Sequence, residues 1–259
     1  MKKNNLKDLI LTSVLAAIVI VMTFVPQLGY ITVGTTAVTL IPIPVFIGVF
    51  LLPLQYSLIL GLFFGVGSLI QALPYEGTLS LNKAFINPLV SVLPRLLTVV
   101  LSYLVYQGLK KIKSTVKQND ILIFSIIIVF TVVLFYYSSQ QIITFTGWND
   151  KVVTLIALLV ISGFITLYYA FINKRKEDVM IPSALILSSF LHTIVVLLAV
   201  LLFESDVLHE LFVAFPTFAD SEIGILITIA ATNGVVETLF AAVIGTPIII
   251  ALKNVQKRI

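Results

Sequence analysis

Two charged side chains fall inside long apolar runs of the sequence. Arg95 lies in "NPLVSVLPRLL", residues 87–97, and Glu237 lies in "TNGVVETLF", residues 232–240. A lone charge in lipid is costly, and ionisable residues within a membrane usually mark a functional site. A guanidinium can hold a carboxylate through a planar fork of donors. The two residues therefore predict either a packing salt bridge or a polar binding pocket, and we favour the pocket.

The depth of both charges can be estimated from the ends of their helices. Asn87-Pro88 is typical of a helix start, with a capping residue before a first-turn proline, so Arg95 lies about 10 Å along that helix. Counting back about 20 residues from Lys253 puts the outer edge of the last helix near Asn233. Glu237 then lies one turn deeper, and both charges fall in the outer half of the membrane.

Three asparagines are expected at the same level. Asn82, Asn87 and Asn233 would add amide donors and acceptors to the predicted ligand site. Asn87 taken alone is better explained as a helix cap.

Composition indicates that the surface faces lipid. The 259 residues are 59% hydrophobic and 11% charged, with a mean hydropathy of +1.12, whereas soluble domains carry roughly 25% charged residues. The apolar runs are continuous and do not alternate, which favours helices over a membrane barrel. The sequence predicts an all-α, polytopic bundle of eight spans, at 9–25, 38–53, 55–73, 88–109, 121–143, 152–172, 180–203 and 223–252.

Two of these spans are unusual. The second is short and contains Pro42 and Pro44, so its first part is not expected to be regular helix. The last is too long for one crossing and is expected to project or break, and Pro247 predicts a kink in it.

The basic residues orient the bundle. With the N-terminus in the cytoplasm, the segments 1–8, 110–120, 173–179 and 253–259 hold 13 of the 16 Lys and Arg residues. This asymmetry follows the positive-inside rule and predicts that both termini are cytoplasmic. The net charge of +4 is thus an orientation signal, and no nucleic-acid partner is expected.

The sequence lacks the residues and motifs that several kinds of chemistry require. The chain has no cysteine, no GxxxxGK[ST] motif and no HExxH motif, so we expect no thiolate site, no phosphate-binding loop of that type and no motif-bound zinc. No cofactor, metal or enzymatic activity is predicted. His192 is interpreted as a packed helix residue and His209 as a solvated one.

Small residues recur at a spacing that allows close helix contacts. Ser57, Gly61 and Gly65 are expected to pack within the chain. Ser13 and Ala17, with Thr12 and Ala16 beside them, leave open whether the first helix packs internally or against a partner.

Several segments together resemble a known family. "IPVFIGVFLLPLQYSLILGLFFGVGSLI", "NPLVSVLPRLL" and "TNGVVETLFAAVIGTPIIIAL" resemble the substrate-binding S component of energy-coupling-factor (ECF) vitamin transporters. "TSVLAAIVIVMTF" and "SALILSSFLHTIVVLLAVLLF" are similar to the family's first and fifth helices.

The resemblance implies a membrane-embedded, high-affinity binding subunit for vitamin uptake in the bacterial plasma membrane. Its implied partners are a transmembrane coupling subunit and two cytoplasmic ATPases, which accounts for the missing phosphate-binding motif. Ser13, Ala16 and Ala17 would form the docking face, and Arg95, Asn233 and Glu237 would lie near an outward pocket. The loops 26–37 and 74–87 would gate that pocket.

The predicted helix count departs from the family's six. Residues 115–178 are interpreted as a two-span hairpin inserted into a single integral membrane domain, 1–259. An arginine in the pocket suits a carboxylate ligand, so pantothenate is the first hypothesis, with folate, lipoate and neutral ligands left open. A stand-alone secondary transporter and a ligand-free membrane scaffold are the alternative functions.

Overall fold

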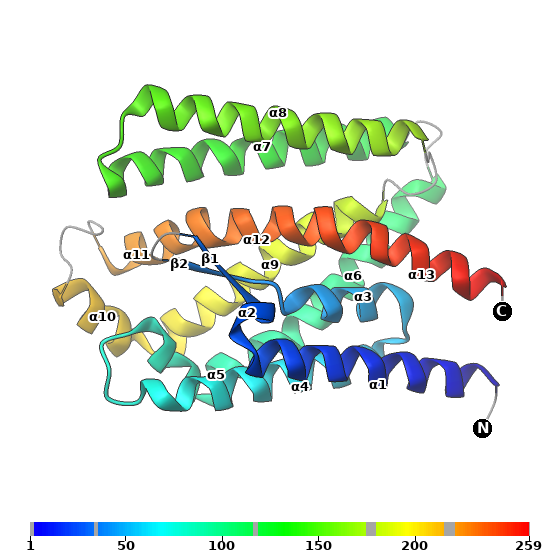
Figure 1. Ribbon diagram of the computed structural model, residues 1–259, viewed down its shortest axis with the longest axis horizontal. Coiled ribbons are helices and arrows are strands. Elements are labelled where there is room, and N and C mark those ends of the chain that lie inside the picture. The colour runs from blue at the N-terminus through cyan, green and yellow to red at the C-terminus, as the bar shows by residue number, and fades with distance from the viewer. Residues whose placement is uncertain (1–2, 34–35, 116–118, 175–179, 215–220, 259) are drawn as a thin grey trace.

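The computed structural model describes residues 3–33, 36–115, 119–174, 180–214 and 221–258. These residues form a bundle of long helices with one small β-hairpin, and both termini lie at the same end of the bundle (Figure 1). The predicted all-α, polytopic membrane architecture is confirmed. The hairpin, strands β1 (Tyr30–Val33) and β2 (Thr36–Thr39), is a small addition to it.

Seven helical segments within the described residues are long and apolar enough to cross a membrane. They are α1 (Lys3–Phe24), α4 (Leu54–Ala72), the pair α5 and α6 (Pro88–Ser91 and Leu93–Thr115), α7 (Asn119–Thr146), α8 (Asp150–Lys174), α9 (Met180–Phe203) and a composite last helix. Shorter elements connect them: α2 (Pro26–Gly29), α3 (Pro42–Leu51), η1 (Leu73–Tyr75), η2 (Leu81–Ile86) and α10 (Ser205–Ala214).

The second predicted span is shorter than a full crossing. Residues 36–39 form strand β2, and α3 begins only at Pro42, because a proline without an N–H is tolerated in the first turn of a helix. The ten residues of α3 extend about 15 Å, roughly half the hydrocarbon thickness. Helix α3 runs toward the end of the bundle that holds the termini (Figure 1). The turn that follows α3 therefore lies at the end where the sequence predicted it.

The last helix is continuous but irregular. It comprises α11 (Glu222–Ile229), α12 (Val235–Phe240) and α13 (Thr246–Arg258), joined by the π-helical segments η3 (Ala230–Gly234) and η4 (Ala241–Gly245). The predicted break therefore takes the form of two wide turns, and Pro247 is the second residue of the helix that follows the second turn.

Small residues let α4 approach its neighbour closely. A Cβ added at Gly65 would lie 2.8 Å from Cα of Val92, and one added at Gly61 would lie 2.8 Å from Cγ2 of Val99. Ser57 on the same face is fully buried. The prediction that this face packs within the chain is confirmed, and the contact places the segment around Arg95 against α4.

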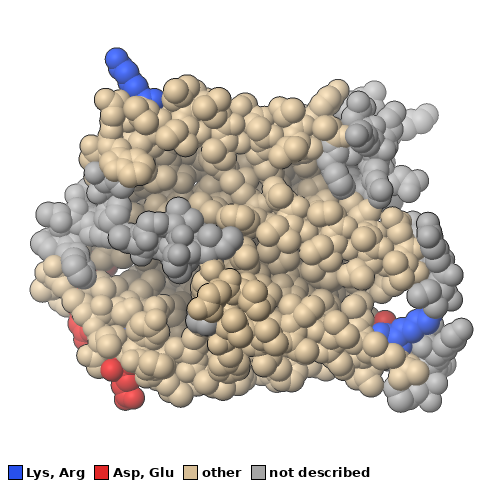
Figure 2. Space-filling view, in the orientation of Figure 1, with Lys and Arg blue, Asp and Glu red and all other residues tan. Residues whose placement is uncertain are grey.

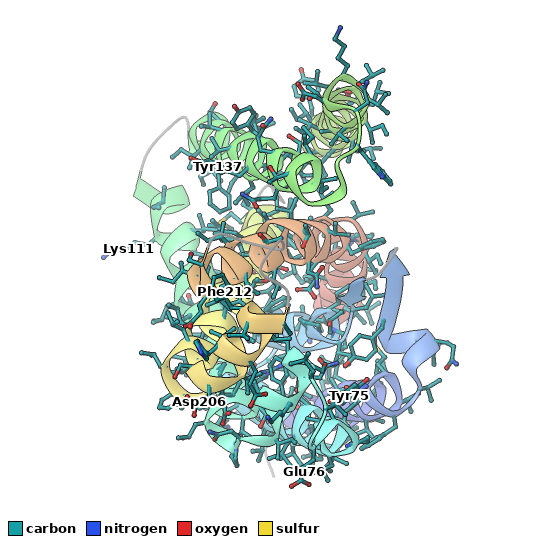
Figure 3. All side chains as sticks on the ribbon, turned by 90° about the vertical axis from the view of Figure 1, so that its left-hand side faces the viewer. Tyr75, Glu76, Lys111, Tyr137, Asp206 and Phe212 are labelled. Carbon is teal, nitrogen blue, oxygen red and sulfur yellow. The ribbon has the colours of Figure 1, made fainter. Side chains whose placement is uncertain are left out.

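The hairpin of α7 and α8 forms a separate layer on one side of the bundle (Figure 1). Figure 3, seen from the end opposite the termini, shows the hairpin on the side away from Tyr75 and Glu76. The helices that flank it in sequence, α6 and α9, pack directly on each other. The space-filling view shows charged side chains only toward the edges of a broad uncharged belt (Figure 2), as expected of a surface in contact with lipid.

Candidate functional site

The functional site candidate is a cavity of about 410 Å³ enclosed by the hairpin β1–β2, α4, η1, η2, α6, α9 and the last helix. Its lining runs from exposed residues, such as Asn82, to buried ones, such as Arg95 and His192. The polar residues of the lining are Tyr30, Thr39, Ser68, Gln71, Tyr75, Asn82, Arg95, His192, Thr193, Asn233 and Glu237. A volume of this order suits a small organic molecule.

Arg95 is held in the cavity by a local break in its own helix. Pro94 has no N–H, so it cannot donate to the carbonyl of Val90 four residues earlier. Nη1 of Arg95 donates to that carbonyl instead, at 2.7 Å. The long side chain of a helical residue points back toward the N-terminus, which is the direction of this bond. The proline thus both frees an acceptor and directs the guanidinium toward the outer end of the helix.

The guanidinium is also fixed by its neighbours. Nη2 donates to Oγ of Ser68 at 3.2 Å, and the guanidinium carbon lies 5.3 Å from the ring centroid of Phe64 and 4.8 Å from that of Phe85. Arg95 is only 6% exposed, and its Nε has no hydrogen-bond partner. Two aromatic faces can stabilise a cation that is removed from water, yet they leave donors of this arginine unused.

Glu237 reaches the same cavity from the last helix. Its Oε1 accepts a hydrogen bond from the backbone N–H of Thr39 at 3.0 Å. Among the described residues, Arg95 and Glu237 form no ion pair with each other. Both residues line one cavity, and the closed salt bridge that was the alternative prediction is not formed between them.

The three predicted asparagines separate in the structure. Asn82 and Asn233 line the cavity. Asn87 is absent from the described lining, and its assignment to the ligand site is corrected. Its Oδ1 accepts from the N–H of Leu89 at 2.9 Å, while its Nδ2 donates to Oε1 of Glu204 at 2.8 Å, so both ends of the amide are occupied. The interpretation of Asn87 as a helix cap is confirmed.

Some lining residues were not predicted from the sequence. Gln71 accepts a hydrogen bond from the hydroxyl of Tyr30 and donates from Nε2 to the carbonyl of Thr23 at 3.2 Å. A lone amide near the end of the apolar run "GLFFGVGSLIQAL" was the signal that could have identified it. Phe64 and Phe85 could not be distinguished from lipid-facing aromatic residues by type alone.

Tyr30 lies in β1, outside the spanning helices, and links the hairpin to α4. Burial raises the pKa of its phenol above the ordinary value, and the hydrogen bond with Gln71 and the charge of Arg95 oppose this shift. The neutral phenol is therefore the form that the folded cavity favours.

The two histidines have different surroundings. His192 packs within the bundle as predicted, with Nδ1 3.3 Å from Oγ1 of Thr98, but it also lines the cavity. His209 is exposed as predicted, and its Nδ1 lies 2.8 Å from Oε1 of Glu222. Within the described residues, no group of three or more His, Asp or Glu side chains is arranged to hold a metal ion.

The predicted docking residues of α1 lie on two faces. Ser13 and Ala17 are exposed, whereas Ala16 is 7% exposed and belongs to the main apolar core. Ala16 therefore packs inside the chain and is not available on the surface for docking. The exposed pair Ser13 and Ala17 is what remains of the predicted face.

The two predicted gating loops both contribute to the cavity. Tyr30 comes from the first, residues 26–37, and Tyr75, Asn82 and Phe85 come from the second, residues 74–87. Residues 34 and 35 of the first loop lie outside the described residues.

Comparison with known proteins gives the family. A protein-family model described as "ECF transporter, substrate-specific component" matches residues 7–153, more than half of the chain. A search of curated protein sequences finds no match. The matched region runs from α1 through α7 and includes Arg95, α4 and the β-hairpin. This chain therefore belongs to the family of substrate-specific components of ECF transporters.

Proposed function

We propose that the chain binds a small carboxylate-bearing vitamin, pantothenate in the first instance, with high affinity for uptake. The family makes the chain a multi-pass cell-membrane protein and the substrate-binding subunit of an ECF transporter. It also implies association with the membrane and ATPase modules of such a transporter. In our proposal the chain contributes binding only and performs no catalysis.

The observation that carries the proposal is the state of Arg95. A buried guanidinium normally meets a carboxylate, because an unpaired charge away from water is costly. Arg95 instead meets a carbonyl, a hydroxyl and two aromatic rings, and retains unused N–H donors. A ligand carboxylate would complete this environment through charge-assisted hydrogen bonds.

The rest of the cavity suits a polar, neutral remainder of the ligand. The Glu237 carboxylate accepts hydrogen bonds from Thr39 and Thr193, and its remaining lone pairs leave capacity for a ligand hydroxyl or amide N–H. The amides of Asn82 and Asn233 offer both donors and acceptors. Pantothenate carries a carboxylate, an amide and two hydroxyls, which match this set.

The test is purification with the proteins encoded beside it. The tagged chain is co-expressed with the neighbouring coupling and ATPase genes, and the purified material is analysed for subunits and for retained small molecules by mass spectrometry. We expect two ATPase subunits, one coupling subunit and the mass of pantothenate. Another carboxylate vitamin would correct the substrate only, whereas a retained solute without any ATPase would favour a stand-alone transporter.

A further inference from the structure

The hairpin of α7 and α8 touches the last helix next to the cavity, at the π-helical segment η3. Oγ of Ser138, on α7, donates to the carbonyl of Ala231 in η3 at 2.5 Å. One turn further along α7, Oε1 of Gln141 accepts from Oγ1 of Thr228 at 3.1 Å. Phe135, one turn before Ser138, packs against Val235 of α12 in a small apolar cluster. One face of α7 thus follows the last helix from residue 228 to residue 235.

The same segment is held from the other side by α9. A Cβ added at Gly234 would lie 2.9 Å from Cγ2 of Thr193, so the backbone of η3 lies directly on that side chain. Thr193 itself lines the cavity. Segment η3 therefore packs between α7 and α9.

The π-helical turn brings three cavity-lining residues of the last helix closer to one line. Ile229, Asn233 and Glu237 all line it, at a constant spacing of four. In a regular α-helix of 3.6 residues per turn, residues eight positions apart point about 80° away from each other. A π-helical turn holds more residues and absorbs that offset. The wide turn η3 thus aligns all three side chains on one face.

A π-helical turn interrupts the regular backbone ladder, and within a membrane the carbonyls it affects need other donors. Serine hydroxyls from neighbouring helices can supply them. Ser138 is 5% exposed, and its hydroxyl donates a hydrogen bond to the carbonyl of Ala231. Its neighbour Ser139 is equally buried but donates to Tyr136 of its own helix, at 2.8 Å. Only the first of the two serines therefore acts on η3.

We propose that the α7–α8 hairpin is a positioning element for the ligand cavity, with Ser138 as the positioning residue that stabilises η3. Through η3 it keeps Asn233 and Glu237 directed at the ligand. The role in ligand binding rests on the proposed function, but the geometric role does not. Removal of the Ser138 hydroxyl should let η3 relax toward an α-helical turn and rotate Ile229 away from the cavity.

The experiment uses a cysteine at position 229 as a reporter, because the native chain has no cysteine. The full-length I229C protein is purified in detergent, and its reaction rate with a small water-soluble thiol reagent is measured. Adding Ser138→Ala should slow the reaction about fivefold or more, Ser138→Thr should restore it, and the matched control Ser139→Ala should leave it unchanged. An unchanged rate in Ser138→Ala, or an equal slowing in Ser139→Ala, overturns the proposal.

A second variant and a second readout complete the test. If Ser138→Ala is not monodisperse, Gln141→Ala removes the other contact at a partly buried side chain, and the same slowing is required of it. Binding of radiolabelled pantothenate is measured in parallel and should weaken about threefold or more with Ser138→Ala. Absence of pantothenate binding in the wild type, with the slowing intact, contradicts the proposed substrate and supports the positioning role. Normal pantothenate binding with an unchanged reaction rate in Ser138→Ala supports the proposed substrate and contradicts the positioning role.

Discussion

The backbone N–H of Thr39 donates a 3.0 Å hydrogen bond to Oε1 of Glu237. This bond joins the end of the β-hairpin to the last helix, 198 positions further along the chain. One carboxylate therefore lines the cavity and holds an element of its wall. In our proposal, a ligand contact at Glu237 would be coupled to the order of the hairpin.

Replacement of Glu237 should loosen the hairpin to an extent that depends on the acceptor. Glu237→Gln keeps an oxygen for the Thr39 N–H, whereas Glu237→Ala removes it and leaves that donor without its partner. We expect hydrogen exchange at Thr39 to be slow in wild type and in Glu237→Gln and at least about tenfold faster in Glu237→Ala. Equal exchange in all three proteins would show that the bond does not order the hairpin.

Replacement of Arg95 should affect ligand affinity more than folding. Arg95→Lys keeps the charge but loses the planar fork, so a carboxylate contact should weaken. Arg95→Ala should cost roughly 2–5 kcal/mol of binding free energy, as truncation of a buried charge partner does. Calorimetry or equilibrium binding of the retained ligand measures the affinity of both variants.

The double variant Arg95→Ala/Glu237→Ala separates a ligand site from a structural pair. A purely structural pair predicts near-wild-type affinity in the folded double variant, because no lone charge remains. A ligand site predicts a folded protein that binds poorly. Near-normal affinity would end the claim that Arg95 serves binding.

Docking of the coupling subunit is expected to depend on the exposed face of α1. Ala17→Trp adds bulk where close helix approach requires a small residue, so transport and co-purification should be lost while ligand binding remains. Leu104→Trp, at another exposed site on α6, is the matched control and should keep both. Loss of ligand binding in Ala17→Trp would indicate that the face packs within the chain.

Alkaline pH should destabilise the fold through Tyr30. Because burial raises its pKa, the contribution of Tyr30 to stability is complete below the unfolded value of about 10 and is lost as pH rises toward the higher folded value. The melting temperature of wild type should therefore fall more than that of Tyr30→Phe between about pH 9 and about pH 11. Parallel decreases in the two proteins would contradict this assignment.

Removal of the hairpin should preserve the core. Because α6 and α9 pack directly on each other, joining residue 114 to residue 179 should give a folded six-helix protein with weakened but measurable ligand binding. Gel filtration and binding assays check this outcome. Aggregation in mild detergent without any binding would mean that the hairpin belongs to the core and that its interpretation as an insertion is wrong.

The sequence predicted the spans well because lipid requires long continuous apolar runs. Arg95, Glu237 and Asn233 were identifiable because a polar group within or at the edge of an apolar run indicates a function. Asn82 was identifiable because its loop was expected at the same level. The break at Pro94 is equally visible, but only the structure shows that it frees the acceptor for Arg95.

Other features depend on relations that no single segment contains. Strands β1 and β2 pair residues 30–33 with residues 36–39, and the second strand overlaps the start of the predicted span 38–53. The π-helical turn η3 accepts a hydrogen bond from Ser138, which lies 93 positions away from its acceptor. Ala16 differs from Ala17 only in its direction around α1, so residue type could not separate the buried alanine from the exposed one.

The short helix α3 has a consequence for the electrical properties of the membrane. Nine of its ten residues are buried, none of the nine has a polar side chain, and most belong to the main apolar core. Moving a bare ion through such a low-dielectric layer is prohibitively costly. We therefore expect no ion path along α3, so that a cell can hold many copies of the protein without dissipating its membrane potential.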